Sequence, residues 1–122
     1  MRGYNKSPLG RQVNWGHPLA NGLIWGLLLN ESAGANANDV TGRGNNGALV
    51  GCKWTGGKYG TALKFNGSSD YVSSQNNIGI SGANPRTVAA WIKIGALSGL
   101  SKIDTVVGWG EGIAGKASVL GV

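Results

Sequence analysis

Short apolar runs, repeatedly broken by clusters of glycine and asparagine, constrain the fold of this chain more than any other feature. Glycine supplies 23 of the 122 residues, against a usual share of about 7%, and it shows no collagen-like G-X-Y period. No stretch carries a sustained apolar period of about 3.6 residues, which would mark an amphipathic helix. Because glycine serves turns and bulges, the pattern predicts an all-β chain.

Several short segments are rich in the apolar, β-branched and aromatic residues of strands: residues 23–29, 48–52, 62–65, 71–73, 87–94, 105–109 and 118–122. Short strands separated by turn residues are typical of an antiparallel β-sandwich or barrel. The alternation is clearest in residues 87–94, where Ile92 and Ile94 share one face and Trp91 lies on the other. We expect Trp25 and Trp91, which lie within strand segments, to belong to the core.

The first 20 residues differ in composition from the rest of the chain. Residues 1–20 are polar and basic, so we expect an extended N-terminal arm, followed by one β domain over residues 21–122. Within that domain, Asn66-Gly67 predicts a hairpin whose loop is longer than two residues. The start of the chain lacks the apolar segment of a signal peptide, and the longest apolar run, residues 23–29, is too short to insert across a bilayer.

The chain is basic, with a formal net charge of +6 at pH 7. A basic balance raises the question of nucleic-acid binding, but the 11 Lys and Arg residues are spread along the sequence without a cluster of three. This spacing favours an ordinary solvated surface and argues against nucleic acid as a partner. The alternative is a weak attraction to acidic glycans or other cell-surface polymers.

Residues that carry out most enzymatic chemistry are sparse. The acidic residues, no two of which lie within six positions of each other, are Glu31, Asp39, Asp70, Asp104 and Glu111. His17 is the only histidine, which disfavours a histidine-based triad or a histidine-rich metal site. Two G-x-G-x-x-G segments, at residues 42–47 and 110–115, lack the following helix that a dinucleotide site needs. We therefore expect that the protein is not an enzyme.

The most specific local motif is Asp-Val-Thr-Gly-Arg-Gly-Asn-Asn-Gly at residues 39–47. Aspartate and asparagine hydrogen-bond to nearby backbone amides, and glycine adopts positive φ. One interpretation is a structural loop that closes the edge of a sandwich. The other is a calcium site built from Asp39, backbone carbonyls and a second carboxylate, Asp70, so calcium is the one cofactor that the sequence suggests.

Three further tryptophans, Trp15, Trp54 and Trp109, stand close to glycines in loops or at the ends of strand segments. Exposed aromatic rings can stack on the faces of sugars, since they combine apolar area with a favourable geometry for C–H groups. The alternative is that these rings are partly buried plugs. Trp54 and Trp109 are the candidate carbohydrate-binding residues.

Four blocks, taken in order, resemble the laminin G-like and concanavalin A-like lectin domains: residues 22–31, 39–49, 57–72, and 86–93 with 106–110. The lead-in at residues 13–23 looks like the start of phage and virion proteins that carry this domain. The resemblance implies a two-sheet jelly roll that binds glycans or proteins. Related glycosidases of this fold use closely spaced acids on one strand, and this chain lacks such a run.

The C-terminus departs from the pattern that the resemblance implies. Domains of this kind usually continue through several more strands, whereas this chain stops within the strand-like residues 119–122. We therefore expect an incomplete, C-terminally truncated jelly roll. Open sheet edges of such a domain can pair with another chain, so self-association is expected.

The expected function is a non-catalytic carbohydrate-binding or adhesion module on the surface of a cell or particle. Its expected partners are a glycan or a surface protein, and its expected location is extracellular or virion-associated. One alternative is a structural domain of a phage tail or virion protein that contacts other virion chains. Another is an accessory domain of a glycoside hydrolase.

Overall fold

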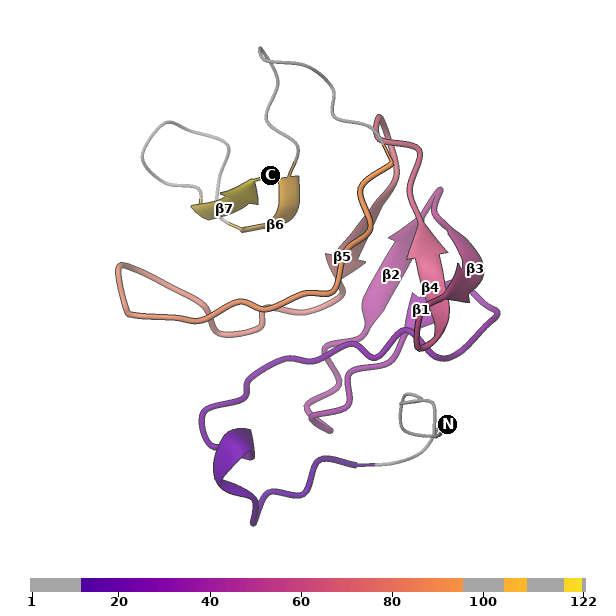
Figure 1. Cartoon of the computed structure of the whole chain (residues 1–122). Helices are drawn as coiled ribbons and strands as arrows, with labels where there is room; N and C mark the ends of the chain where they lie inside the picture. Colours follow the sequence, from indigo (N-terminus) through magenta and orange to yellow (C-terminus); the bar gives the residue numbers. More distant parts are fainter. Residues whose placement is uncertain (1–11, 96–104, 110–117, 122) are drawn as a thin grey trace. The chain divides into compact units, whose positions relative to one another are not determined.

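A computed structural model describes residues 12–95, 105–109 and 118–121 (Figure 1). The elements follow in the order η1 (Pro18–Ala20), β1 (Asn36–Ala37), β2 (Gly47–Val50), β3 (Lys53–Gly57), β4 (Gly60–Lys64), β5 (Tyr71–Ser74), β6 (Thr105–Trp109) and β7 (Ser118–Gly121). Within the described residues the only helical element is the short 3-10 turn η1, and the strand pairs are antiparallel. The all-β expectation is confirmed.

The chain divides into two compact units, Met1–Ser81 and Gly82–Val122. The first unit contains a three-stranded sheet in the order β1-β2-β5 and a separate two-stranded pair, β3-β4. The second unit contains the pair β6-β7, whose register is irregular between Thr105 and Val107. The strand expected at residues 105–109 is therefore present, and the one expected at residues 118–122 is present over Ser118–Gly121, with residue 122 outside the described residues.

The three-stranded sheet is built around β2. Ala48 pairs with Asn36 of β1 on one side and with Ser73 of β5 on the other. A close approach fixes the first residue of β2, because a Cβ atom at Gly47 would lie 2.5 Å from Cγ1 of Val72 and 3.1 Å from Cδ1 of Leu27. Only glycine leaves room for these neighbours at that point.

Strands β3 and β4 form a hairpin around Lys58-Tyr59, with Gly57 paired to Gly60. The positive φ of Gly60, 111°, helps the chain to reverse after these two residues. Because side chains alternate along a strand, Trp54 and Leu63 share one face of the hairpin. The register partners Lys53 and Lys64 share the opposite face.

The face of the hairpin that carries Trp54 is attached to the preceding loop. The Trp54 Nε1–H donates to the carbonyl oxygen of Gly34 at 2.9 Å. The Thr61 hydroxyl, on the same face, donates to the carbonyl oxygen of Leu29 at 2.8 Å. These contacts leave the other face of the hairpin, with its lysines, directed away from that loop.

The buried residues that the structure describes include both small apolar and polar side chains. The buried apolar residues are the small Ala20 and Ala37, while the buried polar residues are Asp39, Thr41 and Asn45. No large side chain among the described residues is fully buried. Polar contacts therefore contribute to the centre of the first unit alongside apolar packing.

The prediction of a strand with a buried Trp91 at residues 87–94 is wrong. The structure assigns no strand to this segment, and Trp91 is 88% exposed, with Ile92 and Ile94 also exposed. Alternation marks a segment that can pair, but a face is buried only when a neighbouring strand places other residues over it. None of the described strands pairs with residues 87–94, which explains why Trp91 is not covered.

Three other expectations from the sequence also change. Residues 23–29 are not a strand, and their one ladder contact is an isolated bridge between Leu27 and Asp39. Asn66-Gly67 does not form a hairpin, because β4 pairs with β3 while β5 pairs with β2. The arm is not wholly extended where it is described, since η1 forms there and buries Ala20.

The strands expected at residues 48–52, 62–65 and 71–73 are confirmed with small shifts of their ends, as β2, β4 and β5.

In the described part of the chain, no helix has the length and apolar character needed to span a membrane.

Candidate functional site

The Asp39 carboxylate accepts four hydrogen bonds from the protein. Its Oδ1 accepts hydrogen bonds from the Thr41 hydroxyl at 2.7 Å and from the Thr41 and Gly26 amides at 3.0 and 3.4 Å. Its Oδ2 accepts from the Asn45 amide at 3.2 Å. The motif predicts hydrogen bonds from nearby backbone amides, and the local contact with Thr41 is of this kind. The contact with Gly26, 13 residues away, is not local and was not predicted.

The bonds around Asp39 decide its charge state. Burial raises the pKa of a carboxyl group, but here hydrogen bonds from Thr41, Asn45 and Gly26 outweigh burial, and the pKa of Asp39 lies below its ordinary value of 3.8. Such bonds stabilise the ionised form because amide and hydroxyl protons point at the negative oxygens. Asp39 is therefore a charged carboxylate at neutral pH.

The loop that follows Asp39 is held at both ends. The Asp39 amide donates to Oδ1 of Asn46 at 2.9 Å, and the Asn45 carbonyl oxygen accepts from Trp25 Nε1 at 2.6 Å. Gly42 and Gly44 both adopt a φ of 76°, which glycine tolerates without strain. The half-buried Trp25 is thus attached to the loop, although the segment around it is not a strand.

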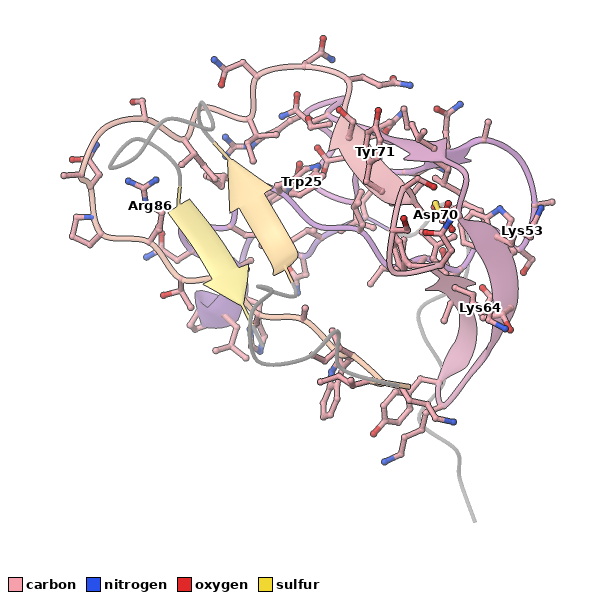
Figure 2. The ribbon with its side chains drawn as sticks, turned by 90° about the horizontal axis from the view of Figure 1, so that it is seen from above. Trp25, Lys53, Lys64, Asp70, Tyr71 and Arg86 are labelled. Atoms are coloured by element: carbon pink, nitrogen blue, oxygen red, sulfur yellow. The ribbon has the colours of Figure 1, made fainter. Side chains whose placement is uncertain are left out.

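The second candidate calcium ligand, Asp70, has partners of its own. Its Oδ2 accepts from the Asn66 amide at 2.9 Å, and the Asn66 side chain in turn accepts from the Asp70 amide at 3.1 Å. Its Oδ1 lies where a Cβ atom at Gly51 would be only 2.2 Å away. Asp70 closes the loop between β4 and β5 (Figure 2).

The geometry of the two carboxylates is that of structural caps. Asp39 already receives four donors from the protein, and a cation would have to displace these donors because metal ions bind the same lone pairs. Among the residues that the structure describes, no three His, Cys, Asp or Glu side chains come together in a way that could hold a metal ion. The structural interpretation of the Asp39 loop therefore has the stronger physical support.

The two candidate sugar-binding tryptophans belong to different units. Trp54 lies on β3 of the first unit, is half-buried and donates its Nε1–H to Gly34. Trp109 lies on β6 of the second unit, and its side chain is outside the described residues. The more exposed aromatic side chains are Trp15 at 51%, Tyr71 at 54% and Trp91 at 88%. Sequence analysis missed Trp91 as a surface residue because its segment has the alternation of a buried strand.

Comparison with known proteins provides no independent assignment. No family model matches the chain, and no curated protein or solved structure is significantly similar to it. The function has to be inferred from the residues and their geometry.

Proposed function

We propose that this chain is a non-catalytic recognition module that binds carbohydrate on the surface of a cell or particle. The observation that carries the proposal is the exposure of large aromatic side chains, with Trp91 88% exposed, Tyr71 54% and Trp15 51%. Aromatic rings of this size usually bury most of their area in a folded protein. Rings that stay at the surface can stack on the apolar face of a sugar ring, where the C–H groups lie.

The state of the acidic residues supports binding over hydrolysis. Glycosidases use a pair of carboxyl groups that face the scissile bond. In the described residues, Asp39 and Asp70 cap loops, and Glu31 accepts a hydrogen bond from the Asn38 amide at 2.8 Å. Each of these side chains has a structural partner, so aromatic stacking accounts for the surface better than acid–base chemistry.

The proposal includes the type of fold and the location. The antiparallel sheets of the first unit, β1-β2-β5 and β3-β4, are consistent with part of a jelly-roll sandwich of the laminin G-like or concanavalin A-like kind. Modules of that kind work outside cells or on virions, which is the location that we propose. The proposal does not require calcium, because hydrogen-bond donors of the protein already occupy the carboxylates of Asp39 and Asp70.

The test is a glycan array probed with the purified chain and two variants. Trp91→Ala removes the most exposed ring, and Leu19→Ala is a matched control because Leu19 is equally exposed and apolar. We expect Trp91→Ala to weaken binding of the best glycan about tenfold, by analogy with the stacking of nucleobases on aromatic side chains, which contributes about 1–3 kcal/mol per base. Leu19→Ala should change it less than about twofold. Absence of binding to any glycan would refute the proposal.

A second candidate function has one observation in its favour. Trp91, Ile92 and Ile94 are all exposed within four consecutive residues, and exposed apolar side chains mark protein–protein contacts as well as ligand sites. A structural domain of a phage tail or virion protein would use this surface to contact another chain. This second function would be favoured if the chain binds no glycan on the array and associates with itself in a concentration-dependent way that Trp91→Ala removes.

A further inference from the structure

The hairpin β3-β4 places two lysines directly opposite each other. Lys53 pairs with Lys64 in the antiparallel register, and both are exposed (Figure 2). The third charged residue of the hairpin, Lys58 at its tip, is also positive and lies 5.3 Å from the centre of the Tyr59 ring. The hairpin from Lys53 to Lys64 contains no acidic residue, so its whole formal charge is positive.

Like charges in directly opposite positions of a sheet destabilise it, because their Cβ atoms are only about 4.5–5.5 Å apart. A carboxylate on the hairpin would offset this repulsion, but residues 53–64 contain none. Glu31, Asp39 and Asp70 lie on other segments, where they accept hydrogen bonds from backbone amides. The lysine pair is therefore a local concentration of positive charge that nothing in the described fold requires.

The lysine face is held in a fixed orientation. The opposite face of the hairpin is attached to the preceding loop through Trp54 and Thr61, and the register continues from Lys53 and Lys64 to Gly57 and Gly60. Two ammonium groups on neighbouring strands are thus presented together to the solvent, and little backbone ordering is needed when a ligand binds.

We propose that the Lys53–Lys64 face binds an anionic polysaccharide through its carboxylate or sulfate groups. The inference rests on the proposed function and narrows the class of ligand. An anionic chain with repeated charges can contact both ammonium groups and relieve their mutual repulsion, which a neutral sugar cannot do. A nucleic acid is a poorer fit, because the Lys and Arg residues are spread along the sequence without the basic cluster that nucleic-acid interfaces carry.

The experiment measures affinities of the purified chain by affinity electrophoresis for four polymers. Polygalacturonate carries carboxylates, dextran sulfate carries sulfates, dextran is neutral, and single-stranded DNA carries phosphates. We expect binding to one or both anionic polysaccharides, weakened by salt. The double variant Lys53→Gln/Lys64→Gln keeps most of both side-chain stems and should bind about tenfold more weakly, as expected for the loss of two exposed ion pairs.

The matched control is Arg43→Gln, which removes a charge from an exposed residue of the same unit outside the hairpin. It should change the affinity less than about twofold. Thermal melts of the double variant guard against a folding artefact, and its melting temperature should not fall, because the substitution removes a repulsive pair.

Four outcomes of these binding measurements would overturn the inference, and each has a different meaning. Unchanged affinity of the double variant for the anionic polysaccharides would show that the lysine pair is not the site. Binding of the glycans on the array without binding of either anionic polysaccharide would overturn this inference but leave the proposed function standing. Tighter binding of DNA than of both anionic polysaccharides would replace the ligand class. No binding to any array glycan or polysaccharide would refute both.

Discussion

At the scale of single residues, Asp39 connects parts of the chain that are distant in sequence. Its carboxylate receives hydrogen bonds from Gly26, Thr41 and Asn45, and Asn45 in turn accepts from Trp25. Hydrogen bonds to a charged acceptor are stronger than those between neutral groups. Removing the carboxylate would leave several amides of a buried region without partners.

We predict that Asp39→Asn lowers the free energy of unfolding by about 2–4 kcal/mol, because an amide nitrogen replaces one acceptor oxygen and faces backbone donors. The control is Asp70→Asn, whose carboxylate accepts the Asn66 amide at a more exposed loop, and it should cost at most about 1 kcal/mol. Denaturant melts of both variants measure the difference. Equal costs would mean that the Asp39 network is not what stabilises the loop.

The charge of Asp39 also predicts how stability depends on pH. Its pKa in the folded protein lies below 3.8, so the unfolded state binds the proton more readily, and stability rises with pH across that range. The contribution is fully present above the ordinary pKa and is lost as the pH falls through the lower folded pKa. Melting temperatures of the wild type and Asp39→Asn should therefore converge on acidification from about pH 5 to about pH 2. Parallel curves would contradict the prediction.

Calcium provides an independent check on the same carboxylate. Because the oxygens of Asp39 are occupied by protein donors, we predict that millimolar calcium leaves the melting temperature unchanged. Magnesium at the same concentration controls for ionic strength. A rise that calcium alone produces, and that Asp39→Ala abolishes, would restore the calcium interpretation of residues 39–47.

At the scale of elements, the sequence locates strands better than it identifies their partners. The apolar runs that became β2, β4 and β5 were found because composition and alternation are local properties. β3 was missed because Gly56 and Gly57 weaken a strand pattern, and its pairing comes from the turn at Lys58-Tyr59. The exposed Trp91 could not be predicted, because burial depends on a neighbouring strand that alternation does not reveal.

The start of β2 gives a prediction at this scale. Gly47→Ala should lower the free energy of unfolding by about 1–3 kcal/mol, because the new methyl group meets Val72 and Leu27 inside the sheet. Gly56→Ala is the matched control, since a Cβ atom there has no neighbour within 4 Å. It should be neutral or slightly stabilising, as alanine restricts the unfolded chain. Chemical denaturation of the two variants measures the contrast, and equal losses would argue against the packing seen around Gly47.

At the scale of the whole molecule, structural and surface roles are carried by different residues. In the first unit, carboxylates and amides close loops around Asp39 and Asp70, and these contacts could be predicted only where they are local in sequence. In the second unit, Trp91 is exposed in a segment outside the strands. The candidate site therefore follows from exposure, a property of the assembled fold, and not from the motifs that drew attention in the sequence.

Protection of exposed tryptophan by a bound glycan tests the central claim most directly. Iodide quenches the fluorescence of solvent-exposed indole rings, so the wild type should be quenched strongly and Trp91→Ala less so. Saturation with the best glycan from the array should reduce quenching of the wild type and should leave Trp91→Ala nearly unchanged. Quenching of the wild type that is the same with and without a bound glycan would contradict the account, because the sugar would then bind without covering the exposed ring.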